Sequence, residues 1–254
     1  MATAGVHYEL VKGKQPKVAS VAVVTLDDGK MNAFTHAFIG AFNAALSRAT
    51  ADAAGSVLIR GNRKALSAGF DLKVMGKGSG DDVAELFAAG FELILRIFEF
   101  PRPVVMACEG HALALGAIML LAADLRLGAA GGSPKAKVGM TEVTINMAVP
   151  VFAVELARQR MPPAVLPHAT LLATLFDHQE AVEAGFLDRL VPLPELHATA
   201  MAEAQRLGAL RNPGFRATKH FLRRETARVM RETLPSELAR VRGKVVHGKH
   251  GAKL

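Results

Sequence analysis

The chain has 254 residues, of which 50% are apolar and 21% are charged, so it can build one large domain or two small ones. This composition excludes a disordered chain, and the single cysteine, Cys108, excludes a disulfide-rich mini-protein. A transmembrane helix is not expected, because the best candidate run, Ala112 to Ala123, is shorter than the roughly 18 apolar residues that a span requires.

The first half of the chain alternates between strand-like and helix-like patterns. Apolar residues recur every four positions from Phe34 to Leu46, which is typical of an amphipathic helix. Helices are expected over residues 34–46, from Asp81 or Asp82 to Phe98, and over 114–123, and strands over 18–26, 56–60, 103–107 and 125–129. Alternating strands and helices predict an α/β core.

The pattern after Val149 is mainly helical, apart from a short strand expected near residues 187–191. A last apolar stripe predicts a terminal amphipathic helix and comprises Leu234, Leu238, Val241 and Val245. We therefore expect an α/β core over residues 1–195 and a helical region over residues 196–254, which packs on the core or on a neighbouring subunit.

The net charge of +8 is concentrated in the C-terminal helical region. From Arg206 to Leu254 there are thirteen Lys and Arg residues against three Glu. Such a segment can face nucleic acid, an acidic membrane, a phosphate-bearing ligand or only solvent. Nucleic acid has little support, because the chain has no Trp and one Tyr for base stacking.

Three loops contain candidate functional residues. Residues 67–72 (Ser-Ala-Gly-Phe-Asp-Leu) and residues 109–118 (Glu-Gly-His-Ala-Leu-Ala-Leu-Gly-Ala-Ile) follow expected strands, and their small residues let the backbone approach a ligand. The second loop also opens a helix, whose N-terminus favours negative charge. In residues 139–143 (Gly-Met-Thr-Glu-Val), burial of Glu142 would raise its pKa and suit a general base. Taken alone, each loop has a simpler interpretation as a turn, as helix–sheet packing or as a surface glutamate.

The order and spacing of these three loops together resemble the crotonase superfamily of enoyl-CoA hydratases and isomerases. The resemblance covers nearly the whole chain, including Ala-Gly-Phe-Leu-Asp at residues 184–188. It implies a spiral of repeated ββα units with a helical C-terminal trimerisation layer. It also implies an acyl-CoA substrate, no permanently bound cofactor, no nucleic-acid or membrane partner, and a homotrimer or hexamer.

The resemblance also implies an oxyanion hole for the thioester carbonyl, made by two backbone N–H groups. These belong to Phe70 and to Leu115, and Ala68 and Gly116 beside them are expected to contact the bound CoA ester. Many relatives have three glycines where this chain has Ala114-Leu115-Gly116. A backbone donor does not require glycine if its φ is compatible, so the hole can persist.

Hydratases of this family carry two glutamates, of which this chain matches only Glu142. The other position is Ile118, whose side chain cannot hold a water molecule by hydrogen bonding. One carboxylate can still move a proton from C2 to C4, which converts 3-enoyl-CoA to 2-trans-enoyl-CoA in fatty-acid metabolism. The pattern resembles mitochondrial Δ3,Δ2-enoyl-CoA isomerases and favours an isomerase. A hydratase that uses Glu142 alone and a non-catalytic acyl-CoA-binding homologue are the alternatives.

Basic residues at several positions are candidates for contact with the phosphates of CoA. Lys73 matches such a position in relatives, and the pair Arg63 and Lys64 precedes the same loop. Lys219 and the pair Arg223-Arg224 are expected to contribute from the C-terminal helices. The glycine-rich residues 74–82 are expected to be mobile and to close over the acyl chain.

Other chemistries find less support in the sequence. A hydrolase triad is not expected, because the G-x-S-x-G motif that holds a nucleophilic serine is absent. This applies to the candidate residues Ser67, His36, His111 and Asp71. We expect Asp71 to be structural and Glu109 not to act as a second base. No metal is expected, because His247 and His250 lack ligand spacing.

The last three residues, Ala252-Lys253-Leu254, resemble a peroxisomal targeting signal. A cytoplasmic location is the first expectation, because the N-terminal residues lack the pattern of a secretory signal, and the peroxisomal matrix is the alternative.

Overall fold

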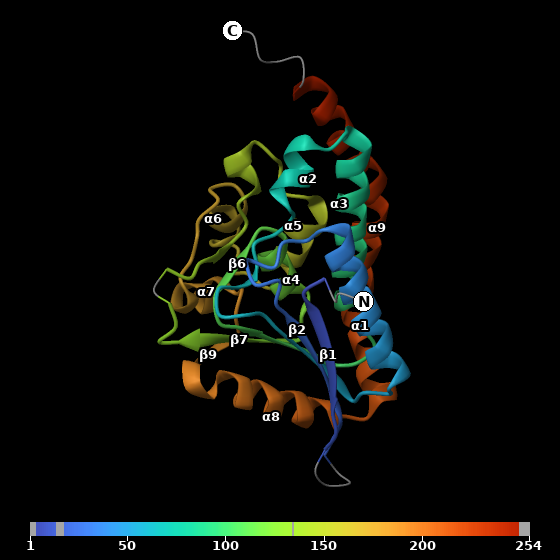
Figure 1. Ribbon diagram of the computed structural model, residues 1–254, viewed down its shortest axis with the longest axis vertical. Helices are drawn as coiled ribbons and strands as arrows, with labels where there is room; N and C mark the ends of the chain where they lie inside the picture. The colour runs from blue at the N-terminus through green and yellow to red at the C-terminus, as the bar shows by residue number, and fades with distance from the viewer. Residues whose placement is uncertain (1–3, 14–17, 134, 249–254) are drawn as a thin grey trace.

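The computed structural model describes residues 4–13, 18–133 and 135–248, which form two β-sheets surrounded by helices (Figure 1). A six-stranded sheet has the order β1-β2-β3-β5-β7-β9, and a three-stranded sheet has the order β4-β6-β8. All pairings are parallel except that of β1 with β2. The strands are β1 (Val6–Val11), β2 (Val21–Leu26), β3 (Ser56–Arg60), β4 (Ala65–Ser67), β5 (Val104–Cys108), β6 (His111–Leu113), β7 (Leu125–Ala130), β8 (Val138–Gly139) and β9 (Arg189–Pro192).

Helices follow the strands in a repeating pattern. The pairs β3–β4, β5–β6 and β7–β8 each give one strand to the large sheet and the next to the small sheet before a helical segment begins. The helices are α1 (His36–Ala51), α2 (Leu72–Lys77), α3 (Gly80–Phe98), α4 (Leu115–Ala122), α5 (Val151–Arg158), α6 (Leu166–Thr170), α7 (His178–Ala184), α8 (Leu196–Gly208) and α9 (Asn212–Gly248), with short 3-10 helices η1 (Glu142–Ile145) and η2 (Leu193–Glu195). This arrangement confirms the predicted spiral of ββα units.

Each face of the large sheet is buried against a different layer, because alternate side chains of a strand point to opposite faces. Val21, Val23 and Leu58 pack against α8, which runs along one face of the sheet (Figure 1). Ala22 and Val24 point to the opposite face and belong to the main core with residues of α1, α3 and α4. The sheet is therefore a central layer, and the small sheet lies on the side away from α8.

The predicted strands and helices of residues 18–130 are found close to their expected bounds. The strands β1, β4, β6 and β8 were not expected, and three of them are only two or three residues long. Residues 74–82 are not an open glycine-rich loop: α2 extends to Lys77 and α3 begins at Gly80. The cap of α3 is Ser79 rather than Asp81 or Asp82. Its hydroxyl accepts from the backbone of Asp82, whose carboxylate accepts from Ser79.

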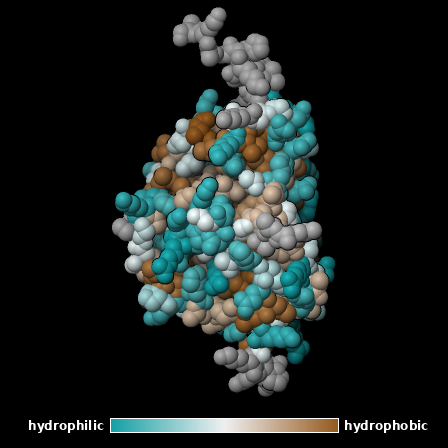
Figure 2. All heavy atoms as spheres, viewed as in Figure 1, coloured by the Kyte–Doolittle hydropathy of each residue, from teal (hydrophilic) through white to brown (hydrophobic). Residues whose placement is uncertain are grey.

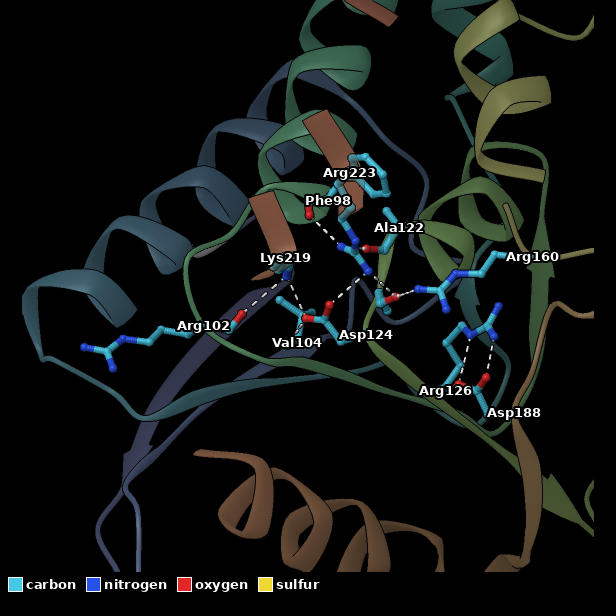
Figure 3. A network of polar contacts seen from close by, with 11 residues as sticks. Phe98, Arg102, Val104, Ala122, Asp124, Arg126, Arg160, Asp188, Lys219 and Arg223 are labelled. Atoms are coloured by element: carbon cyan, nitrogen blue, oxygen red, sulfur yellow. Dashed lines mark hydrogen bonds and ion pairs between the residues drawn. The ribbon is translucent and has the colours of Figure 1, made fainter. Parts of the chain in front are cut away.

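The long helix α9 is fastened to the core by a buried cluster of charges around Asp124 (Figure 3). The carboxylate of Asp124 accepts from Lys219 Nζ at 2.7 Å and forms an ion pair with Arg223 Nη2 at 2.9 Å. Arg223 also donates to the carbonyls of Phe98 and Ala122, at the C-terminal ends of α3 and α4. Cations at these positions are stabilised by the negative ends of the two helix dipoles. Part of the positive charge of the C-terminal region is therefore buried, and this part has a structural partner.

Among the helices of the described residues, none is long and apolar enough to span a bilayer.

Candidate functional site

The small sheet brings the three loops of interest to one edge. Its strands β4, β6 and β8 are adjacent and parallel, so their carboxyl ends lie on the same side. The first loop continues from the end of β4, the second contains β6 and runs into α4, and the third continues from the end of β8. Ligands bind preferentially at the carboxyl ends of parallel strands, because loops and helix N-termini converge there.

In the first loop, the N–H group of Phe70 points away from Phe34, the residue with which Phe70 forms a backbone bridge. Phe34 N donates to Gly69 O at 2.8 Å, and Asp71 N donates to Phe34 O at 3.1 Å, which forms a parallel bridge between Phe34 and Phe70. In such a bridge the N–H of the central residue points to the opposite side. The second loop lies next to this one, since a Cβ added to Gly69 would lie 2.8 Å from Ala114 Cβ and 3.3 Å from Leu115 N.

The second loop places Leu115 at the first position of α4, where an N–H group has no partner within its helix. Ala114 precedes it with φ +48 and ψ −123, a conformation that glycine adopts more readily. Gly116 is required by close packing, because an added Cβ would lie 2.3 Å from Ser67 O. Phe70 and Leu115 therefore lie in adjacent loops, and two such N–H groups beside a helix N-terminus suit a developing oxyanion.

The third loop holds Glu142, the first residue of η1, which is only 7% exposed. Its Oε2 has no hydrogen-bond partner within the described part of the chain. Burial raises the pKa of this carboxyl above its ordinary value, and backbone hydrogen bonds at Glu142 and Thr141 oppose the change only in part. A buried carboxylate with a free oxygen can accept and return a proton.

The remaining surroundings of the site are apolar. Ile118 is buried in the first half of α4, so no carboxylate stands at the position of the second hydratase glutamate. A Cβ added to Gly90 in α3 would lie 2.5 Å from Phe70 Cζ and 3.0 Å from Leu115 Cδ2, so the side chains of both donor residues contact α3. The ring of Phe70 also lies 6.2 Å from that of Phe87. The side chains of the two donor residues are therefore packed in apolar surroundings.

The expected phosphate contacts separate into two groups. Arg63, Lys64 and Lys73 are exposed around the first loop, and Ala68 is half-buried there with its N–H bonded to Met31 O. Lys219 is buried and ion-paired, as is Arg223, so the expectation that these two reach a phosphate is corrected (Figure 3). The sequence could not show this, because their partner Asp124 is about a hundred residues away. Burial lowers the pKa of Lys219 to about 8, although Asp124 opposes that change.

Several other polar groups have structural partners. Asp71 is the N-cap of α2 and accepts from Lys73 N at 2.8 Å, as expected of a structural residue. Glu109 pairs with Arg63 and His197, and His111 Nδ1 accepts from Lys137 N. His36 is exposed at the start of α1.

The described residues contain no group of three or more His, Cys, Asp or Glu arranged to hold a metal ion. His250 and Ala252-Lys253-Leu254 lie outside the described residues, and the side chain of His247 is not described either.

Two further residues near the site are not among the candidates that the sequence motifs indicate. Gly90 lies in the middle of a strongly amphipathic helix, where glycine is unfavourable, and this conflict signals a close approach of other side chains. Asn32 is fully buried with φ +53, and its side chain bonds to the strand that leads into the first loop. Nothing in its sequence neighbourhood indicated burial.

Comparison with known proteins assigns the family. The family model described as enoyl-CoA hydratase/isomerase matches residues 17–248. The chain belongs to the enoyl-CoA hydratase/isomerase family. The resemblance to the crotonase superfamily is thereby confirmed. A solved structure of a family member from Pseudomonas syringae is 36% identical, with a TM-score of 0.86 over 94% of this chain and 99% of that one.

Two curated relatives point to different reactions. Carnitinyl-CoA dehydratase from Salmonella enteritidis is 31% identical over 60% of this chain, and the match spans 56% of the dehydratase. Human mitochondrial enoyl-CoA delta isomerase 1 is 26% identical over 82% of this chain and 69% of the isomerase. This enoyl-CoA hydratase/isomerase family member is thus similar to a lyase and to an isomerase.

Proposed function

We propose that this protein converts 3-enoyl-CoA to 2-trans-enoyl-CoA, with Glu142 as its single acid–base residue. The observation that carries the proposal is the buried Glu142 carboxylate with an unpartnered oxygen, in a site where Ile118 replaces the second carboxylate. The human relative is named an isomerase, which supports the same choice.

The residues act in a simple sequence. Glu142 removes a proton from C2 of the acyl group, and the electron pair moves into the thioester, so that its oxygen becomes negative. The N–H groups of Phe70 and Leu115 stabilise that oxygen, and removing one such donor typically costs about 2.7–4 kcal/mol. Protonated Glu142 then delivers the proton to C4 while the double bond moves to C2–C3. CoA carries the acyl group, and the proposed reaction uses no further cofactor.

Exposed cations hold the CoA in this proposal. All three are exposed: Arg63 and Lys64 lie just before β4, and Lys73 lies just after the first loop. Each is placed to approach a phosphate from solvent, at little cost in desolvation.

Addition or removal of water is the second candidate. The name of the Salmonella relative favours it, because a dehydratase removes water. Such a reaction would have to hold its water molecule with Glu142 alone, since Ile118 offers no hydrogen bond.

A homotrimer is part of the proposal. Apolar side chains are exposed in η1 and just after α6: Val143, Ile145, Leu171, Leu172 and Leu175. A cavity of about 630 Å³ opens between η1, α5 and α6, and Val143 and Leu171 line it. An exposed apolar surface of this kind is typical of a contact between subunits.

The test is to incubate the purified protein with 3-enoyl-CoA and, separately, with 2-trans-enoyl-CoA, and to analyse the products by mass and by chromatography. We expect the first substrate to give its isomer with unchanged mass, and the second to gain no water. Gain of water by the second substrate without isomerisation of the first would support the hydratase instead. Turnover of neither, with tight binding of both, would show a binding protein.

A further inference from the structure

The hydroxyl of Ser67 joins two parts of the first loop. Its Oγ donates to the carbonyl of Asn32 at 2.7 Å and accepts from Gly69 N at 3.1 Å. Ser67 is fully buried, and Gly69 directly precedes Phe70, whose N–H is the first proposed oxyanion donor. The Ser67 hydroxyl therefore fixes the orientation of the peptide group that precedes that donor.

The partner of Ser67 is itself held rigidly. The side-chain amide of Asn32 donates to Leu26 O at 2.9 Å and to Ala65 O at 2.8 Å, and its Oδ1 accepts from Asp28 N at 3.0 Å. The neighbouring residue Met31 accepts from Ala68 N at 2.9 Å. The segment whose carbonyl accepts the hydrogen bond from Ser67 is thus fixed to the ends of both β2 and β4.

Ser67 also lies against the second donor loop. Its carbonyl is the atom that a Cβ on Gly116 would approach to 2.3 Å, so the backbone of Ser67 packs on the first turn of α4. A change at Ser67 therefore affects the spacing between the loop of Phe70 and the helix that begins at Leu115.

We infer that Ser67 is a positioning residue of the oxyanion hole, acting through Gly69 on the N–H of Phe70 and fixed by Asn32. This inference rests on the proposed function. Ser67 is not a nucleophile: its hydroxyl is buried, and its proton is directed at a backbone carbonyl. Preorganised donors lose much of their effect when they are misplaced by about 1 Å, which typically costs about 100-fold in rate.

The chain contains a matched control for a substitution at this position. Ser56 is also fully buried, and its Oγ donates to a backbone carbonyl, that of Ala204, at 2.6 Å. This bond joins β3 to α8, on the face of the large sheet away from the small sheet. Ser56→Ala and Ser67→Ala therefore remove the same chemical group from equally buried sites.

The experiment measures kcat and KM for 3-enoyl-CoA, the dissociation constant of free CoA, and the fraction of bound 3-oxoacyl-CoA that is present as its ultraviolet-absorbing enolate. We expect Ser67→Ala to lower kcat by about 10- to 100-fold and to lower the enolate fraction. We expect binding of free CoA, which has no thioester carbonyl, to change less than about two-fold. Ser56→Ala should leave all four quantities near those of the wild type.

A second variant separates hydrogen bonding from filling of space. Ser67→Cys keeps a side chain of similar shape but bonds weakly, so it should also lose kcat and enolate. A Ser67→Cys variant with wild-type kcat would overturn the inference, as would equal losses in Ser67→Ala and Ser56→Ala. A wild-type protein that neither isomerises 3-enoyl-CoA nor forms the enolate would instead refute the proposed function.

Discussion

Glu142 is placed where the requirements of catalysis and of stability oppose each other. Its carboxyl is buried, one oxygen is unpartnered, and its pKa is raised by desolvation. A base with a raised pKa takes a proton more readily, which suits abstraction from carbon. The same burial makes the ionised form costly in the folded state, because a buried charge without a counterion is destabilising.

We expect Glu142→Gln to abolish isomerisation and to stabilise the fold at neutral pH. The unfolded chain ionises this carboxyl at its ordinary pKa, whereas the folded chain retains the proton to higher pH, so stability falls as pH rises through that interval. Glutamine does not ionise, so the variant does not lose this stability as the pH rises. Urea unfolding at pH 5 and pH 8 should show a larger gain for the variant at pH 8, while kcat falls by at least about 100-fold.

The exposed Glu85 of α3 provides the control for this prediction. Glu85→Gln should change stability by less than about 0.5 kcal/mol at either pH. In the wild type, kcat/KM should fall on the acid side with a pKa above that of an ordinary glutamate. A Glu142→Gln variant that retains activity would show that another group is the base.

Ala114 carries backbone strain at the junction of β6 and α4. Its φ of +48 lies where non-glycine residues are disfavoured, which costs on the order of 1–3 kcal/mol. Ala114→Gly should therefore raise the free energy of unfolding by about 1 kcal/mol, less the entropy that glycine loses on folding. Ala117→Gly, three residues later inside the same helix, should lower it by about 1 kcal/mol or more. If thermal unfolding shows that the first variant is more stable and the second less stable than the wild type, the strain at Ala114 is confirmed. If both variants are less stable, it is contradicted.

At the scale of elements, Asp124 connects the α4–β7 corner to α9. It forms ion pairs with both Lys219 and Arg223, and also accepts from Val104 N at 2.8 Å. Removal of one partner from a buried ion pair leaves an uncompensated charge, which typically costs about 3–5 kcal/mol. Asp124→Asn should therefore destabilise the protein by about that amount and expose α9 to trypsin.

The exposed pair of Glu225 and Arg228 in the same helix gives the comparison. Glu225→Gln should leave the stability almost unchanged, because exposed ion pairs contribute little. Equal effects of the two substitutions in urea unfolding and in proteolysis would show that the Asp124 cluster does not anchor α9.

Elements with enough length to show a period could be predicted from the sequence. The helix predicted from Phe34 to Leu46 and the strands β2, β3, β5 and β7 of the large sheet are examples, because apolar spacing reports burial directly. The strands β4, β6 and β8 have two or three residues each, too few for any period. Yet these strands bring Phe70, Leu115 and Glu142 to one edge, so only the family resemblance could indicate that the three loops meet.

Charge in the C-terminal region was harder to interpret. A Lys or Arg in a helix is normally solvated, and nothing local distinguishes Lys219 from its exposed neighbours. Its burial depends on Asp124, which α4 and β7 place beside α9. The same limit applies to Asn32 and Ser67, whose partners are mostly backbone groups of distant segments.

At the scale of the molecule, the two sheets divide structural and functional roles. The large sheet is buried between α8 and the main core, and it supplies none of the three residues of the proposed mechanism. The small sheet presents its carboxyl ends to the three loops. Charged substitutions at buried positions facing α8 should therefore affect folding, whereas the proposed chemistry depends on residues that follow the small sheet.

Association of subunits also concerns the whole molecule, and the exposed apolar surface near α6 is the proposed contact. Figure 2 shows apolar residues interrupting the hydrophilic surface on the upper part of the molecule. Leu171 and Leu172, which follow α6, are 71% and 64% exposed, and Leu171 lines the same cavity as Val143. Burial of two such leucines stabilises a contact by roughly 3–6 kcal/mol.

We expect the joint substitution Leu171→Asp and Leu172→Asp to convert a trimer to monomers in sedimentation, because carboxylates cannot be buried without a partner. The joint substitution Phe221→Asp and Leu222→Asp on α9 is the matched comparison, since these residues are 66% and 72% exposed. It should leave the trimer intact. If the α9 variant dissociates and the α6 variant does not, subunits meet through the C-terminal helical layer, as the family resemblance alone implied. Monomeric wild-type protein would refute both interfaces.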